Sequence, residues 1–240
     1  MLDPDIQIFE SLDSTQLYAK AHLLEFDEDK LTVIWAHHQS QGMGRKERKW
    51  VSKKGNLFFT FCFFTDEDFT YQSCIFVLAL SVVKVLKKHH IDTQLKWPND
   101  LLVSRKKMGG ILADFCVKQE KRAFLIGLGL NVNLKDVSLI DKEATSLFLQ
   151  THKTFNEEHL GLEIIAQFQK DLVDFFANGF DPFYEDLLVC MVHKPKDRLV
   201  IEVDHKKIEA HFHTITKKGY LEVKQNHQLL TFSDASIHEF

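Results

Sequence analysis

The sequence predicts an α+β fold, in which helices flank a mixed and largely antiparallel sheet and a small β-barrel follows at the C-terminus. Three observations lead to this class. Several strand-like segments follow one another between residues 93 and 133 without a helix between them, which favours antiparallel pairing over a doubly wound parallel sheet. Two long amphipathic segments can cover such a sheet. Short strand candidates also follow a polar, proline-containing stretch at 192–197.

The first half of the chain supplies the large sheet. Its strand candidates are apolar or alternate in polarity, and they are 5–10, 31–37, 56–64, 93–97, 101–104, 109–117 and 122–133. Ser14 or Asp13 is placed to cap a short amphipathic helix after the first strand. Apolar residues at helical spacing predict a core-facing helix over 71–88.

The second half predicts a helix and then a small domain. The amphipathic helix covers 159–180, with Gly179 near its end. We place the domain boundary between 1–191 and 192–240. The strand candidates of the small domain are 198–203, 207–215, 220–225 and 229–233.

Composition excludes several protein classes. With 45% hydrophobic residues the chain can bury an ordinary core, and its net charge of -4 gives no field that attracts nucleic acid. Its four cysteines form no CxxC pair, so we expect reduced thiols. The N-terminus lacks the pattern of a signal peptide, and the longest apolar run, 74–86, is too short to span a bilayer. We expect a cytoplasmic protein that does not enter a membrane.

Residues 39–50, QSQGMGRKERKW, combine two glycines with four basic residues. Glycine lets backbone N–H groups approach an anion, and Arg45 directly after Gly44 adds a planar fork suited to phosphate or carboxylate. Glu47 stands where a dinucleotide fingerprint would have its third glycine, and no GK[ST] follows as in a P-loop. The alternative is a mobile, solvated basic loop that binds nothing.

Residues 96–112, KWPNDLLVSRKKMGGIL, bring polar groups to strand ends. Asn99 and Asp100 form a turn after the proline, at the same strand end as Lys96. Lys107 precedes two glycines and a buried strand directly, which leaves little room for a fully solvated charge. The alternative is a hairpin lysine whose amine extends to water.

Gly127 and Gly129 fall on one face of the strand at 122–133, and Asn131 continues that face. Two glycines inside a strand indicate that a flat object or another backbone packs there. A bulge or a tight crossing of the sheet would explain them equally well.

Read together, these segments resemble the biotin protein ligase family, which is related to the lipoate ligases. The matching segments keep the family's order and spacing over nearly the whole chain; they are LDSTQ (12–16), 39–50, KWPNDLL (96–102), KKMGGIL (106–112), GLGLNVN (127–133) and ATSL (144–147). The resemblance implies a class II synthetase-like catalytic fold with an SH3-like C-terminal barrel. It also implies that biotin and ATP form biotinyl-adenylate, with Mg²⁺ accompanying ATP, before a lysine of a biotin carboxyl carrier protein of acetyl-CoA carboxylase takes the biotinyl group.

The resemblance also assigns site residues. Lys107 and Arg45 are the expected catalytic residues. The expected biotin-binding residues are Ser14, Thr15, Gln16, Gln39, Met43, Gly44, Arg45, Lys107, Gly127 and Gly129. The expected ATP-binding residues are Arg45, Trp50, Lys96, Asn99, Asp100, Lys107 and Asn131. No residue is expected to hold a metal of its own.

The chain departs from the family pattern at several positions. Met43 replaces the first arginine of the usual GRGR, Glu47 stands where glycine is common, and Gln16 replaces asparagine. The C-terminal domain lacks the usual GIDxxG and GEV signatures. These departures keep two alternatives open, a lipoate or octanoate ligase or transferase of the same superfamily and a non-catalytic biotin-binding module.

Regulation of DNA is not expected. The LDST motif begins at residue 12, which leaves no room for the N-terminal helix-turn-helix of many relatives, and the chain is acidic overall. A homodimer through a sheet edge remains one option.

Overall fold

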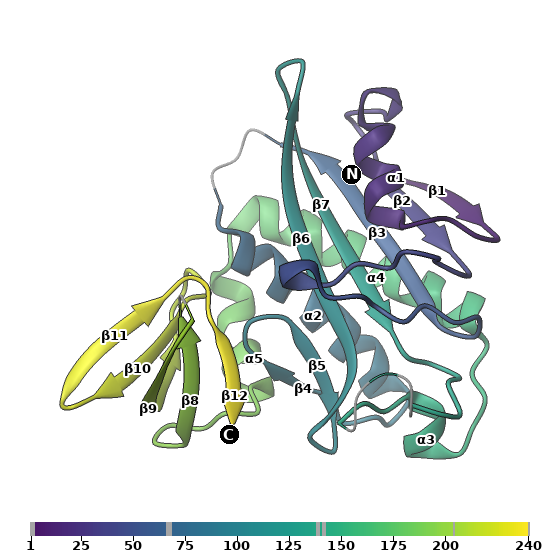
Figure 1. The fold of residues 1–240 in the computed structure, drawn as a ribbon. Coiled ribbons are helices and arrows are strands. Elements are labelled where there is room, and N and C mark those ends of the chain that lie inside the picture. The colour runs from purple at the N-terminus through teal and green to yellow at the C-terminus, as the bar shows by residue number, and fades with distance from the viewer. Residues whose placement is uncertain (1–2, 66–68, 138–139, 141–142, 204, 240) are drawn as a thin grey trace.

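The computed structural model describes residues 3–65, 69–137, 140, 143–203 and 205–239. Its larger sheet has seven strands in the order β1-β2-β3-β7-β6-β5-β4 (Figure 1). These strands are β1 (Pro4–Phe9), β2 (Leu31–Ala36), β3 (Leu57–Phe64), β4 (Gln94–Lys96), β5 (Asp100–Val103), β6 (Lys106–Lys118) and β7 (Lys121–Leu130). β1 and β2 pair in parallel and the other neighbours pair antiparallel, which confirms the predicted fold class.

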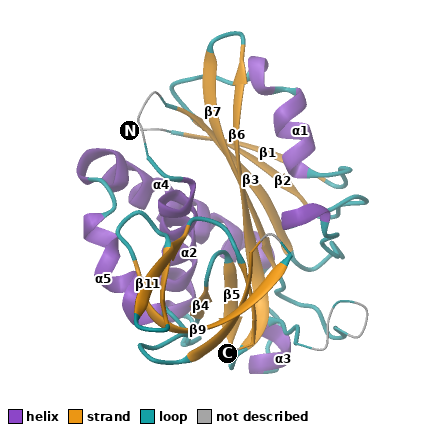
Figure 2. Ribbon diagram, turned by 60° about the vertical axis from the view of Figure 1, so that its left-hand side comes forward, coloured by secondary structure: helices purple, strands orange, loops and turns teal. Residues whose placement is uncertain are grey.

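The two faces of this sheet differ in what covers them. Helices α2 (Tyr71–Lys88), α4 (Glu157–Asn178) and α5 (Asp181–Cys190) gather on one face, over the main hydrophobic core (Figure 2). Helix α1 (Thr15–Ala21) covers part of the opposite face with a smaller apolar cluster. The predicted cap of α1 is confirmed, because Ser14 accepts a hydrogen bond from the Leu17 backbone N–H. The rest of this second face is free to carry a site.

Two helices were missed by the sequence patterns. Helix α3 (Leu147–Thr151) is a single short segment, and α5 follows α4 almost directly. Gly179 ends α4 with φ +69°, a conformation that favours glycine. Pro182 lies in the first turn of α5, where its missing N–H costs nothing.

The C-terminal domain is a five-stranded sheet in the order β11-β10-β9-β8-β12. Its strands are β8 (Arg198–Val203), β9 (Lys206–Ile215), β10 (Leu221–Gln225), β11 (Gln228–Phe232) and β12 (Ser236–Glu239). The sequence predicted the first four, and β12 is additional because its four residues give little pattern. Within residues 198–203 and 205–239, no ladder joins β11 to β12, so closure into a barrel stays a prediction.

The small domain packs against the N-terminal end of α2. Gly219, with φ +77°, comes so close that a Cβ there would lie 2.5 Å from Cβ of Gln72. Trp97 Nε1 donates to the Gly219 carbonyl at 2.9 Å, and the Thr70 hydroxyl donates to the Lys218 carbonyl at 2.8 Å. These contacts fix one end of the small domain beside the large sheet.

Two further observations bear on the sequence predictions. All four cysteines are free; Cys62 and Cys74 are buried, and burial raises the pKa of the Cys62 thiol to about 12. In the described part of the chain, no helix combines the length and apolar character needed to cross a bilayer.

Candidate active site

A cavity of about 420 Å³ lies on the face of the large sheet opposite α2 and α4. It is bounded by β3, β6 and β7, by the segment 39–50 that crosses this face, and by the start of β12. The predicted site residues all line it: Ser14, Thr15, Gln16, Gln39, Met43, Gly44, Arg45, Trp50, Lys96, Asn99, Asp100, Lys107, Gly127, Gly129 and Asn131. The fold therefore brings together residues that are up to 117 positions apart in the sequence.

One end of the cavity is a buried network of uncharged polar side chains. Gln39 Oε1 accepts from the Thr15 backbone N–H at 2.8 Å and from the Thr15 hydroxyl at 3.2 Å. The hydroxyl of Thr60 lies 2.9 Å from Thr15 Oγ1 and 3.1 Å from Gln16 Oε1. This end can hold a neutral polar head group by hydrogen bonds.

The middle of the cavity is cationic. Lys107 Nζ lies 2.6 Å from Asp100 Oδ1 and 5.5 Å from the centre of the Trp50 ring. The backbone of Lys107 is held on both sides, since its N–H donates to the Glu143 carbonyl at 2.7 Å and its carbonyl accepts from the Thr145 N–H at 2.8 Å. The lysine amine is thus directed into the cavity from a fixed backbone position.

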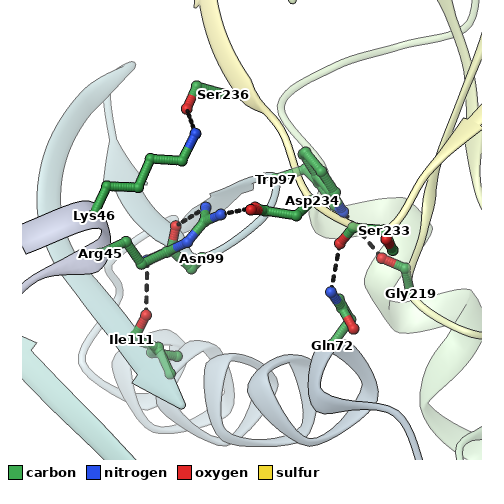
Figure 3. A network of polar contacts seen from close by, with 10 residues as sticks. All are labelled: Arg45, Lys46, Gln72, Trp97, Asn99, Ile111, Gly219, Ser233, Asp234 and Ser236. Carbon is green, nitrogen blue, oxygen red and sulfur yellow. Dashed lines mark hydrogen bonds and ion pairs between the residues drawn. The ribbon is translucent and has the colours of Figure 1, made fainter. Parts of the chain in front are cut away.

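Arg45 reaches the cavity from the loop and is held by two domains (Figure 3). Its guanidinium donates to Asn99 Oδ1 at 3.3 Å and forms an ion pair with Asp234 of the C-terminal domain. Asn99 is itself fixed, because its Nδ2 donates to the Ile111 carbonyl at 2.7 Å. A substrate anion near Arg45 would meet a cation already oriented by two side chains, Asn99 and Asp234.

The glycines of β7 have no Cβ, so a flat ring and an amide group can pack closely against the backbone of the strand. The Trp50 ring lies directly on Gly129, where a Cβ would be only 2.6 Å from the indole. A Cβ at Gly127 would lie 3.0 Å from Gln16 Oε1. Of the two explanations from sequence, close packing of a flat group is confirmed, and that group is a side chain of the protein itself.

Like charges concentrate around the cavity. Arg45, Lys46, Arg48, Lys49, Lys96, Arg105 and Lys107 line it, against Asp100 and Glu143. Burial lowers the pKa of Lys96; the two carboxylates oppose this effect, and the neighbouring cations Lys107 and Arg105 add to it. An anion in the cavity would relieve this repulsion.

Several residues of the site carried no clear signal in the sequence. Thr60 is the single polar residue of β3, and it faces the cavity between apolar neighbours. Asp114 lies behind Gln16 and accepts from its Nε2 at 3.1 Å. Ser236 of β12 contacts Lys46 Nζ at 3.1 Å. Only the isolated polar residue in an apolar strand could have pointed to Thr60; the other two depend on tertiary packing.

Comparison with models of protein families shows which family the chain is related to. The model of the biotin/lipoate A/B protein ligase family matches residues 8–133, more than half of the chain. The chain belongs to this family. The match runs from β1 to the end of β7 and thus contains most of the cavity lining of this biotin/lipoate ligase family member.

Individual relatives agree with this assignment. The bifunctional ligase/repressor BirA of Bacillus subtilis is 30% identical over 159 residues, covering 63% of this chain and 49% of that protein. Chloroplastic biotin–protein ligase 1 of Arabidopsis thaliana is 27% identical over 194 residues, covering 76% and 53%. The chain thus matches about half the length of these curated relatives. The biotin protein ligase of Aquifex aeolicus, solved with biotin and ATP, superposes with a TM-score of 0.86 at 25% identity, covering 98% and 99% of the two chains.

The structure shows how two departures from the family pattern are accommodated. The Met43 side chain is 39% exposed, while its backbone pairs with that of Lys49. The backbone of this residue is thus held within the loop, while the residue itself lines the cavity. Glu47 has φ 60°, in the left-handed region that glycine adopts most easily. Glu47 thus adopts a backbone conformation that glycine reaches with less strain.

Proposed function

We propose that the protein is an ATP-dependent biotin ligase that forms biotinyl-5'-AMP and transfers the biotinyl group to a lysine of a biotin carboxyl carrier protein of acetyl-CoA carboxylase. The observation that carries the proposal is the order of groups along one cavity. A neutral polar end lies beside Gln16, a cationic middle contains Lys107 and Arg45, and an aromatic border is formed by Trp50. This order matches a ureido ring, a carboxylate with phosphate, and a purine.

The first half-reaction joins two anions. A carboxylate oxygen of biotin attacks the α-phosphorus of ATP, and the bond to the bridging oxygen breaks to release pyrophosphate. Lys107 and Arg45 offset the repulsion and bind the negative charge on the equatorial oxygens. A unit charge about 4 Å from phosphate gains roughly 4 kcal/mol at an effective dielectric of about 20, of which only the part that grows in the transition state speeds the reaction.

Before substrates bind, both cations contact internal carboxylates. Lys107 is paired with Asp100 and Arg45 with Asp234. These carboxylates keep the cations oriented in the cavity, and substrate oxygens take over or share the contacts. In the second half-reaction the neutral ε-amine of the carrier lysine attacks the anhydride carbonyl, and AMP leaves as the amide forms with loss of a proton.

Mg²⁺ would enter with ATP and screen the charge of its phosphates. The carboxylates of Asp100 and Glu143 line the cavity and offer the oxygen ligands that this ion prefers. Within the described residues no group of three or more His, Cys, Asp or Glu side chains is arranged to hold a metal. The cavity therefore suits a Mg²⁺ ion whose ligands come mainly from the nucleotide.

Biotin-dependent exchange of pyrophosphate into ATP tests the proposal. We expect exchange with biotin and none with lipoate or octanoate. Lys107→Ala should abolish exchange while biotin binding stays measurable. Lys106→Ala is a matched control, because this neighbouring lysine is exposed and does not line the cavity. Near-normal exchange by Lys107→Ala would show that the catalytic assignment is wrong.

The same assay separates the alternatives. Exchange with lipoate or octanoate would identify a ligase for those acids. Biotin binding without any exchange would identify a non-catalytic module. We also propose that the reaction takes place in the cytoplasm and involves no DNA; specific binding of an operator-sized duplex at physiological salt would contradict the latter.

A further inference from the structure

The two glutamine side chains at the polar end of the cavity have orientations that their neighbours determine. Gln39 must direct Oε1 toward Thr15, because the backbone N–H found there at 2.8 Å can only donate. Gln16 must direct Nε2 toward Asp114 Oδ2 at 3.1 Å and the Leu125 carbonyl at 3.2 Å, since both of these only accept. Each amide therefore has one possible assignment of oxygen and nitrogen.

This assignment leaves an acceptor facing the cavity. Gln16 Oε1 lies next to Gly127, on the cavity side of the sheet. Its partner is the Thr60 hydroxyl, which is fully buried and also lies 2.9 Å from Thr15 Oγ1. The single hydrogen of Thr60 cannot serve both oxygens fully, and the Thr15 hydroxyl is directed to Gln39. Gln16 Oε1 is thus served only by a hydrogen that Thr60 shares between two oxygens.

Asp114 controls this arrangement without lining the cavity. It lies on β6 opposite Leu125 of β7 and forms an ion pair of 2.9 Å with Lys20 of α1. Its carboxylate cannot donate, so a reversed Gln16 amide would place two oxygens against each other. Lys20 Nζ contacts Oδ2 of Asp114, the same atom that accepts from Gln16.

We propose that Asp114 is a positioning residue, which fixes the Gln16 amide so that this end of the cavity accepts hydrogen bonds from N–H groups of the ligand. The inference rests on the proposed function and extends it to the head group. A cyclic urea supplies the missing hydrogens, whereas a dithiolane ring or an alkyl chain supplies none. Gln16 and Asp114 together thus select biotin over the acyl substrates of the wider family.

Asp114→Asn tests the proposal with almost no change in shape. The asparagine amide can donate to Gln16 Oε1, so only the Leu125 carbonyl still opposes a reversed Gln16 that presents its NH₂ group to the ligand. Calorimetric titration should show that biotin affinity falls roughly fivefold to tenfold, the effect of one hydrogen bond. The KM for biotin should rise by the same factor, with the KM for ATP and kcat unchanged.

Two biotin analogues, each methylated on one ureido nitrogen, distinguish positioning from general damage. The ratio of wild-type to Asp114→Asn affinity should fall below about twofold for the analogue that lacks the donor to Gln16. Lys20→Met keeps the acceptor and should leave biotin affinity within about twofold of wild type. Asp27→Asn is the surface control, because Asp27 also pairs with a lysine, Lys30 at 3.7 Å, and both side chains are about half exposed.

Each other outcome contradicts the proposal. Equal losses for biotin and both analogues would show a merely structural role, and an unchanged affinity for biotin would show none. If the wild-type protein bound no biotin at all, the proposed function would fall and the inference with it. Wild-type binding with an unaffected Asp114→Asn variant would overturn the inference alone.

Discussion

In the side chain of Asn131, the amide nitrogen has a hydrogen-bond partner and the amide oxygen has none among the described residues. Its Nδ2 donates to the Thr145 carbonyl at 3.0 Å, which fixes the orientation of the amide. Its Oδ1 is buried at the cavity and has no hydrogen-bond partner among the described residues. An unpaired buried acceptor costs about 1–3 kcal/mol, so a ligand donor there is favoured. The exocyclic amino group of adenine is such a donor.

Replacing ATP by ITP removes that amino group and presents a carbonyl to Asn131 Oδ1. We expect kcat/KM for ITP to be lower by roughly tenfold to a hundredfold, because two acceptors would face each other. Pyrophosphate exchange at matched nucleotide concentrations measures the ratio. In Asn131→Ala the preference for ATP should shrink; an unchanged preference would place the base elsewhere.

At the scale of elements, the two glycines of strand β7 adjoin two different parts of the cavity. Gly127 adjoins the Gln16 amide and Gly129 lies under the Trp50 ring, so the two positions serve different parts of the cavity. The strand is central in the sheet and paired on both sides, by β3 and β6. Its backbone therefore cannot shift to make room for added atoms.

Alanine at each glycine should affect a different substrate. Gly129→Ala should displace the Trp50 ring and raise the KM for ATP, by roughly tenfold for the usual cost of overpacking. Gly127→Ala should act on Gln16 and raise the KM for biotin instead. Steady-state kinetics with each substrate varied in turn provide the test, and Trp50 emission should shift only in Gly129→Ala. Identical effects of the two variants would contradict this division.

At the scale of the whole molecule, the C-terminal domain helps to hold the loop that carries Arg45. The contacts of Arg45 with Asp234 and of Lys46 with Ser236 join 39–50 to the segment before and within β12 (Figure 3). These pairs are partly exposed, and such pairs typically contribute up to about 1 kcal/mol. These contacts thus favour the observed position of the loop, but they are weak enough for the loop to open.

Asp234→Ala should therefore loosen the loop without unfolding the domain. We expect trypsin to cut the basic segment 45–49 roughly twofold to fivefold faster in the variant. Biotin with ATP should slow cleavage of the wild-type protein, because the clustered cations repel one another until an anion binds. Glu209→Ala, at an exposed acid of the same domain, should behave like wild type. Equal cleavage with and without substrates would show that the loop does not close on them.

The sequence by itself determined the largely antiparallel core and the helix over 71–88, and its resemblance to a known family assigned most of the residues around the cavity. The core and the helix depend on local patterns of apolar periodicity, whereas the site residues were assigned from motifs that match the family. The same patterns did not reveal α3, α5 or β12, because short elements repeat too few times to show a period.

Only the tertiary structure decided which partners these residues have. It placed the Trp50 ring on Gly129, paired Lys107 with Asp100 and Arg45 with Asp234, and put Asp114 behind Gln16. Asp234 is 189 positions from Arg45 and Asp114 is 98 positions from Gln16. No local pattern encodes such distances, since they follow from how strands pair and how the C-terminal domain packs against the sheet.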